Sequence, residues 1–244
     1  MATPVLAELR RPAGRDGARS EVRSAARAGV ASGAVPDGVA PVSKPAGLPV
    51  LPALERLLPG GLPLGQAVTV DGVGALPLAL IAGAVAARRP TEPGPEHWCA
   101  VVGLPDAGVL AAAEMGADLD RILLVDEPGE RWAEIVATLV TAVDVVLMRP
   151  PSPPPAGTVR RLMALARRHG VALVVVGGWD GAASRLQVTA SLWTGLGDGH
   201  GHLRGRRVQV VADGRGAGRR PRSAWLWLPG PDGTVAPADL EAVA

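Results

Sequence analysis

Five short apolar runs, separated by longer segments with helical features, constrain the fold of this chain more than any other feature. Uninterrupted short apolar runs are typical of strands that are buried on both faces of a sheet. Their alternation with helices predicts a parallel sheet that is covered by helices on both sides. The predicted strands cover residues 67–70, 99–102, 122–125, 143–148 and 171–176.

Four helices are predicted between these strands. Pro77 fits the first turn of the first helix, where a missing N–H costs nothing. Asp106 is expected to cap the second helix and Gly116 to end it, while Gly170 is expected to stop the fourth. The predicted helices cover residues 76–88, 106–115, 129–142 and 158–169.

The pattern changes after Gly178, where apolar and polar residues alternate along three segments joined by glycine-rich turns. Alternation with a period of two predicts half-buried strands, and the turns predict antiparallel pairing. These segments cover residues 186–193, 203–212 and 224–228. The predicted fold class is therefore α/β, with a mainly parallel sheet flanked by helices and a C-terminal antiparallel extension.

The two ends of the chain differ in composition from its centre. Residues 1–47 are rich in Arg, Ala and Pro and are predicted to form a flexible arm, residues 48–228 the core domain, and residues 229–244 a C-terminal tail. The N-terminus has no apolar signal region. The most apolar run, residues 73–87, is shorter than the roughly 20 residues that span a bilayer. We therefore expect a cytoplasmic protein that does not enter a membrane.

Charge is unevenly distributed along the chain. Residues 1–47 carry seven basic and four acidic side chains, residues 48–150 six and thirteen, and residues 151–244 twelve and six. A basic C-terminal third beside an acidic middle suggests a polyanion or an acidic surface as the partner. A merely solvated surface explains the same pattern equally well.

The segment after the first predicted strand, residues 71–76, has the topology of a phosphate-binding site but not its chemistry. A strand, a glycine turn and a helix N-terminus are the usual elements of such a site. A working loop has the pattern G-x-x-x-x-G-K-[ST]. Here Gly72 and Gly74 are too close together to enclose a phosphate, and Ala75 and Leu76 stand where Lys and Ser or Thr are needed. An alternative is that this turn was never a phosphate site.

The fourth predicted strand also lacks the acid that such a site uses to hold magnesium. It ends in residues 148–150, Met-Arg-Pro, and Asp144 lies at its start, which is the wrong end of a parallel strand for catalysis. With both elements missing, we expect neither ATP hydrolysis nor a bound cofactor.

The order of several segments resembles the RecA-like superfamily, and more closely the ImuA and ImuA′ proteins of bacterial mutagenic repair. Residues 48–50 and 60–66 look like the lead-in to the first strand, where a GGLP-x-G turn precedes the nucleotide loop. Residues 117–123 are similar to the segment before the third strand, and residues 186–188 and 203–211 to the paired late strands. The resemblance implies a RecA-like P-loop core with a degenerate loop.

The resemblance also implies a function, which is accessory to error-prone DNA synthesis induced by damage. The implied partners are an ImuB-like polymerase homologue and an error-prone polymerase, with DNA, RecA or a second copy of the chain as further candidates. Two alternatives stay open: an NTPase with an atypical loop, and a cell-division inhibitor similar to SulA. The connections at residues 150–157 and 177–185 are short where RecA places its DNA-binding loops.

Arginines of the C-terminal third are the candidate residues for binding DNA or a partner. They would form one basic patch if the ends of two strands meet, and phosphate contacts would then bind without reading sequence. Trp225 and Trp227 lie nearby and are expected to pack rather than stack on bases. The candidates are Arg204, Arg206, Arg207, Arg215, Arg219, Arg220 and Arg222.

No metal site is expected. Cys99 is the only cysteine, so it forms neither a disulfide framework nor a thiolate cluster. His200 and His202 share a spacing that would suit a metal, but no third ligand is evident, and an exposed glycine-rich turn explains them better.

Overall fold

The computed structural model describes residues 47–72, 74–86, 96–197, 200–214 and 220–238. The predicted arm, apart from its last residue, lies outside the described residues, as does the end of the predicted tail. The described part begins with a pair of short antiparallel strands, β1 (Gly47–Leu48) and β2 (Leu62–Pro63), which flank the short 3-10 helix η1 (Pro52–Leu54).

All five predicted apolar strands are confirmed, and they pair in parallel in the order β3-β7-β6-β4-β5. Two of them, β6 and β7, begin slightly later than predicted. Every side chain of β3, β4, β6 and β7 is buried, as expected for strands covered on both faces. The strands are β3 (Ala67–Val70), β4 (Cys99–Val102), β5 (Ile122–Val125), β6 (Val145–Met148) and β7 (Ala172–Val176).

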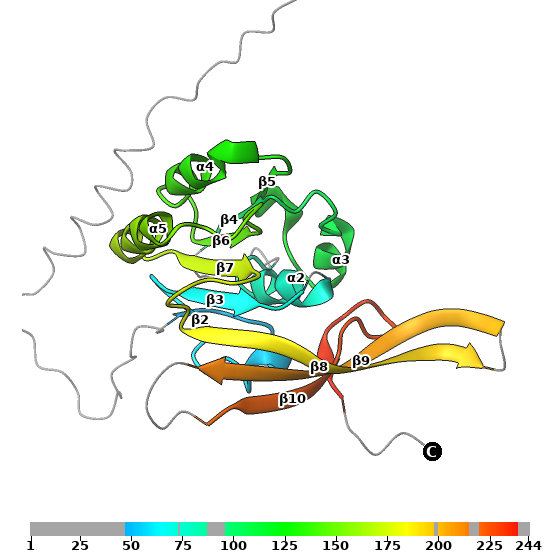
Figure 1. The fold of residues 1–244 in the computed structure, drawn as a ribbon. Coiled ribbons are helices and arrows are strands. Elements are labelled where there is room, and N and C mark those ends of the chain that lie inside the picture. The colour runs from blue at the N-terminus through cyan, green and yellow to red at the C-terminus, as the bar shows by residue number, and fades with distance from the viewer. Residues whose placement is uncertain (1–46, 73, 87–95, 198–199, 215–219, 239–244) are drawn as a thin grey trace, which may run out of the picture. The chain divides into compact units, whose positions relative to one another are not determined.

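The predicted antiparallel extension is also confirmed. Its first strand, β8 (Ser184–Gly197), pairs in parallel with β3 and antiparallel with β9 (His200–Gly214). The sheet continues through β10 (Arg222–Trp227) to β11 (Ala236–Pro237). Within the described residues, nine strands thus form one sheet, in the order β11-β10-β9-β8-β3-β7-β6-β4-β5 (Figure 1).

Part of the predicted tail belongs to this sheet. Residues 236–237 pair with the end of β10, and Ala238 is buried. The prediction of a tail from residue 229 was therefore wrong for residues up to 238. No apolar run signalled β11, because a two-residue strand carries too little pattern to be recognised.

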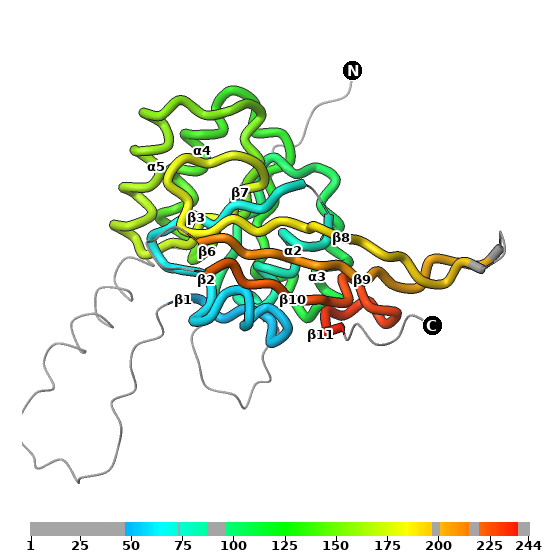
Figure 2. Tube along the Cα trace, turned by 60° about the horizontal axis from the view of Figure 1, so that its bottom comes forward, coloured from blue at the N-terminus to red at the C-terminus, as the bar shows by residue number. Residues whose placement is uncertain are grey.

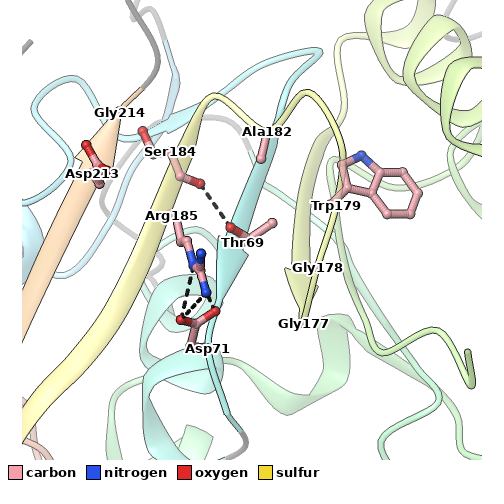
Figure 3. A pocket seen from close by; sticks show the side chains of 10 residues that line it. All are labelled: Thr69, Asp71, Gly177, Gly178, Trp179, Ala182, Ser184, Arg185, Asp213 and Gly214. Carbon is pink, nitrogen blue, oxygen red and sulfur yellow. Dashed lines mark hydrogen bonds and ion pairs between the residues drawn. The ribbon is translucent and has the colours of Figure 1, made fainter. Parts of the chain in front are cut away.

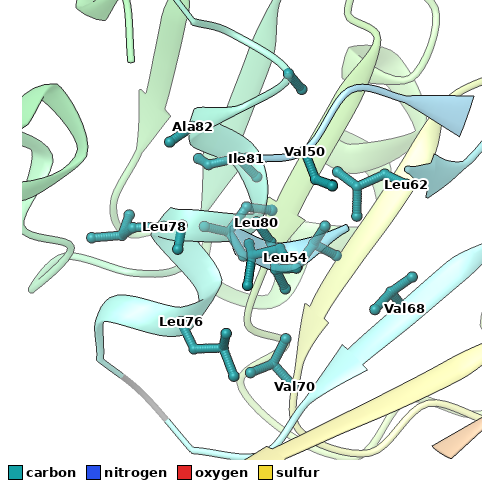
Figure 4. Close-up of a cluster of buried hydrophobic side chains, with 14 of the residues drawn as sticks. Val50, Leu54, Leu62, Val68, Val70, Leu76, Leu78, Leu80, Ile81 and Ala82 are labelled. Atoms are coloured by element: carbon teal, nitrogen blue, oxygen red, sulfur yellow. The ribbon is translucent and has the colours of Figure 1, made fainter. Parts of the chain in front are cut away.

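Helices cover the two faces of the parallel half (Figure 1). One face packs against α2 (Ala75–Ala82) and α3 (Val109–Glu114), together with η1. The other face packs against α4 (Trp132–Leu139), which follows the 3-10 turn η3 (Gly129–Arg131), and against α5 (Ala156–His169). Figure 4 shows the first core, in which Leu54 of η1 and Leu80 of α2 are fully buried.

Three helices are shorter than predicted, among them α4, which spans residues 132–139 where 129–142 was predicted. α2 ends at Ala82, and the next residue is Gly83, where a Cβ would lie only 2.3 Å from the backbone of Val50 and Leu51. At this glycine the chain after β1 therefore crosses the end of the helix. α3 begins at Val109, and its N-cap is Gly108, so the predicted capping role of Asp106 was wrong.

Beyond the point where β10 stops pairing, β8 and β9 continue together as a two-stranded projection (Figures 1 and 2). We call residues 192–197 and 200–205 the β8–β9 ribbon. Two register shifts interrupt the pairing of β8 with β9, one before the ribbon at Val188/Ala190 and one within it at Thr194/Leu196. No helix in the described residues is long and apolar enough to cross a bilayer.

Candidate functional site

The turn between β3 and α2 lies at the carboxyl end of the parallel strands, where α/β proteins usually bind ligands. Gly72 and Gly74 adopt positive φ angles of 80° and 131°, and Gly74 is the N-cap of α2 without a side-chain cap. Leu76 is buried at 3% exposure and packs into the core below the helix. The turn therefore presents aliphatic groups where a phosphate site needs a cation and a hydroxyl.

Asp71, the residue that enters this turn, is held by two residues of β8. Arg185 donates to its carboxylate from Nη2 at 2.8 Å and from Nε at 3.1 Å, and Gln187 donates through Nε2. The Asp71 N–H also donates to the carbonyl of Leu186 at 3.0 Å. These bonds fasten the end of β3 to the antiparallel extension.

The electrostatics of Asp71 follow from this arrangement. Burial by itself would raise the pKa of the Asp71 carboxyl, but hydrogen bonds from Arg185 and Gln187, with the Arg185 charge, outweigh it and lower the pKa. The same pair raises the pKa of Arg185. Asp71 is thus an ionised, partnered carboxylate. Sequence analysis did not single it out, because nothing in the sequence links residues 114 positions apart.

A cavity of about 330 Å³ lies beside this ion pair (Figure 3). Figure 3 shows the Asp71–Arg185 pair and Thr69 on one wall, with the Thr69 hydroxyl donating to the carbonyl of Ser184 at 3.5 Å. Gly177 and Gly178, directly after β7, also line the cavity and leave open space where a Cβ would stand. The described residues contain no group of three or more His, Cys, Asp or Glu that could hold a metal.

A second cavity of about 330 Å³ lies on the other side of the turn. Gly72, Ala75 and Leu76 line it together with Arg206 of β9. Arg206 donates from Nε to the Ser191 hydroxyl at 2.7 Å, and its guanidinium lies 5.5 Å from the Trp193 ring centroid. The fold thus brings one of the candidate arginines to the turn at Gly72, which the sequence did not predict.

The described candidate arginines are spread along β9 and β10. The register places Arg207 opposite Trp227 and Arg222 opposite Ala212, five residues further along β9. The register therefore places Arg222 away from Arg207 along the sheet. Arg207 is buried at 9% exposure, with its guanidinium 5.3 Å from the Trp227 ring centroid, and Arg204 is exposed on the ribbon. Arg220 is exposed two residues before β10, whereas Arg215 and Arg219 lie outside the described residues.

The fourth parallel strand has the residues expected from the sequence at both of its ends. At its carboxyl end, Arg149 donates from Nε to the Gly103 carbonyl at 3.3 Å. At its amino end, Asp144 accepts the Trp98 N–H at 2.9 Å and lies 3.7 Å from Nδ1 of His97. Asp144 therefore ties β6 to the segment before β4, far from the turn at Gly72.

Comparison with known proteins gives two matches. The family model described as the MT3502 N-terminal domain matches residues 56–181, which include the parallel half of the sheet and end before β8. An uncharacterized protein, Rv3395c of Mycobacterium tuberculosis strain H37Rv, is 34% identical over 171 residues, covering 65% of this chain and 80% of that relative.

Proposed function

The chain belongs to the MT3502 N-terminal domain family, and on that premise, with its resemblance to ImuA-type proteins, we propose that it is a non-catalytic adaptor in damage-induced, error-prone DNA synthesis. In this role it binds a polymerase-like protein, and DNA through the exposed arginines of the antiparallel extension. The degenerate RecA-like core serves as a scaffold.

One observation carries the non-catalytic part of this proposal, namely the chemistry of the turn after β3. A triphosphate with magnesium needs positive charge and a hydroxyl ligand at the helix N-terminus. This turn instead presents the carboxylate of Asp71, the methyl group of Ala75 and the buried Leu76. Because Arg185 already neutralises Asp71, neither side chain is left to serve a nucleotide.

Thermal melting of the full chain with and without Mg-ATP tests this part. We expect the same melting temperature in both conditions, because a ligand stabilises the fold only when it binds the native state. A rise in melting temperature that grows with ATP concentration would contradict the proposal.

A specific observation favours one alternative, an NTPase with an atypical loop. Arg206 lines the cavity at Gly72 and is the one arginine found there among the described residues. If the alternative holds, phosphate release from ATP will be measurable and Arg206→Ala will abolish it, while the exposed Arg204→Ala will not. The adaptor proposal expects no release from any of these proteins.

The partner is tested by co-purification from cells before and after DNA damage. The adaptor proposal expects a polymerase-like protein to be retained by the tagged chain. Retention of a cell-division protein instead would favour the SulA-like alternative.

DNA binding is tested by titration at several salt concentrations, where Arg204→Ala and Arg220→Ala should each reduce the salt dependence.

A further inference from the structure

Helix α5 exposes a strongly basic face. Four of its side chains are exposed arginines, and the helix contains no acidic residue. We call them the arginine face of α5: Arg160, Arg161, Arg167 and Arg168. None of the four forms an ion pair with another described residue. The whole segment 145–179 has no aspartate or glutamate, so no acid close by in the sequence offsets these charges.

The arginines form two parallel rows along the helix. Arg160 and Arg167 are seven residues apart, and so are Arg161 and Arg168. Seven residues complete almost two turns of an α-helix and rise about 10.5 Å, so the members of each pair lie on one line along the axis. Neighbouring residues of a helix are separated by about 100°, which is therefore the angle between the two rows.

Small residues lie between the two rows. The helical repeat places Gly157 and Ala164, which are also seven residues apart, at angles between those of Arg160 and Arg161. Both are exposed, and a Cβ on Gly157 would meet nothing. The strip between the rows therefore holds no long side chain. Because the distance between packed helices depends on the side chains at their contact, another helix can approach α5 closely here.

Acidic side chains lie on either side of α5. Residues 126–134, which lead into α4 and form its first turn, carry four acids and one arginine, all exposed. α4 packs beside α5 on the same core. On the other side, Asp180 is exposed in the loop after β7, next to Trp179 of that core. A nucleic acid that spreads beyond α5 meets these acids, whereas a single helix, about 10–12 Å across, fits on α5 alone.

We propose that the arginine face of α5 is the docking surface for an acidic helix of another protein. The partner helix lies along α5 over Gly157 and Ala164, and presents carboxylates seven residues apart to each row. Arginine suits this contact, because its planar guanidinium donates two parallel hydrogen bonds to one carboxylate. None of the described helices has two acidic side chains seven residues apart, so the partner is a different protein.

This surface is separate from the residues used in the proposed function. α5 lies beside α4 on one face of the parallel half of the sheet, whereas Arg204 and Arg220 belong to the antiparallel extension (Figures 1 and 2). The inference therefore does not depend on the adaptor role, and failure of either proposal leaves the other untouched.

Fluorescence anisotropy with a labelled synthetic peptide and the full chain tests the proposal. The probe is an alanine-rich helical peptide with two rows of glutamates, seven residues apart, on one face. The comparison peptide has the same composition, with its glutamates distributed around the helix. The one-faced peptide should bind at least about tenfold more tightly, and added salt should weaken its binding, because the contact is electrostatic.

Variants of the chain then locate the contact. Arg160→Ala with Arg167→Ala removes one row and should weaken binding of the one-faced peptide by about tenfold or more. Alanine is the best helix former, so α5 should stay intact, and circular dichroism verifies this. The control is Arg56→Glu, which changes the net charge of the chain by the same amount at an exposed residue beside η1 and should leave binding unchanged.

A further variant, Ala164→Trp, separates a helical partner from a nucleic acid. The large ring fills the strip between the rows without changing the charge, so it should weaken binding of the one-faced peptide. A phosphate backbone held by charge alone would tolerate it. The same titrations with labelled single-stranded and duplex DNA should show no loss of binding in any α5 variant.

Three outcomes would overturn the proposal. Equal affinity for the two peptides excludes recognition of spacing, and an unchanged affinity in the variant without Arg160 and Arg167 excludes α5 as the surface. If that variant loses DNA binding while its affinity for the one-faced peptide stays the same, the arginine face is a nucleic-acid surface instead.

Discussion

One ion pair, between Asp71 and Arg185, defines the candidate site. The pair lies where β3, the turn and β8 meet. The positive charge of Arg185, of the kind that a nucleotide site needs for its ligand, is neutralised by Asp71. The Asp71 side chain is 34% exposed, so solvent screens the pair and its contribution to stability is small.

We predict that Asp71→Asn lowers the free energy of unfolding by about 0.5–1 kcal/mol at neutral pH. Because folding lowers the pKa of Asp71, its stabilisation is complete above the unfolded pKa, near 4, and is lost as pH falls through the lower folded value. Denaturant unfolding at pH 7 and at pH 3 measures the difference between variant and wild type, which should shrink in acid. The exposed Asp180→Asn is the control and should behave like the wild type at both pH values.

Cys99 offers a second prediction at this scale. The thiol is fully buried in β4, and burial raises its pKa to about 12 despite a hydrogen bond from the backbone of Leu147. Only the thiolate reacts, so a disulfide reagent should leave the folded chain unmodified and label one thiol after unfolding in guanidinium. Rapid labelling under native conditions would show that β4 opens or is not buried.

At the scale of elements, helix ends are decided by backbone geometry. Gly170 follows α5 with φ of 70°, a left-handed conformation that stops the helix and turns the chain into β7. We predict that Gly170→Ala destabilises the fold by about 1 kcal/mol, since a side chain is strained at this φ. Gly157→Ala, inside the same helix where a Cβ meets nothing, should instead stabilise it by about 0.5–1 kcal/mol. Thermal melting of both variants checks the opposite signs.

The same reasoning applies to the close crossing at the end of α2. A Cβ on Gly83 would meet the backbone of Val50 and Leu51 at 2.3 Å, and neither can rotate away as a side chain would. We predict that Gly83→Ala costs about 1–3 kcal/mol of stability, the usual penalty for overpacking a core. A melting temperature equal to that of the wild type would show that residues 47–51 are not held against the helix.

At the scale of the whole molecule, one apolar core joins the two halves of the sheet. It extends from Leu147 of β6 and Val174 of β7 to Val208 of β9 and Leu226 of β10 without interruption. We therefore predict one cooperative unfolding transition for the described part of the chain. Tryptophans lie in both halves, for example Trp132 and Trp227, so coincident fluorescence and circular dichroism curves would confirm it, and two separated transitions would contradict it.

The parallel half of the fold could be predicted from local sequence patterns. Runs such as residues 99–102 and 172–176 are short and apolar at every position, a pattern typical of strands that are covered on both faces. The chemistry missing from residues 72–76 is equally a property of the sequence, because an alanine and a leucine carry no charge in any conformation. The features that depend only on residues close together in the chain could therefore be predicted from the sequence.

The contacts between residues far apart in the chain could not be predicted in this way. Folding brings Arg185 to Asp71 and Arg206 to Gly72. It separates Arg207 from Arg222 through the register of β9. It also packs Gly83, which follows α2, against the segment that precedes β2. Pairing across a sheet is set by packing and register between strands far apart in the chain, and no local period records it. The fold therefore follows from the pattern of single segments, whereas the site follows from contacts among them.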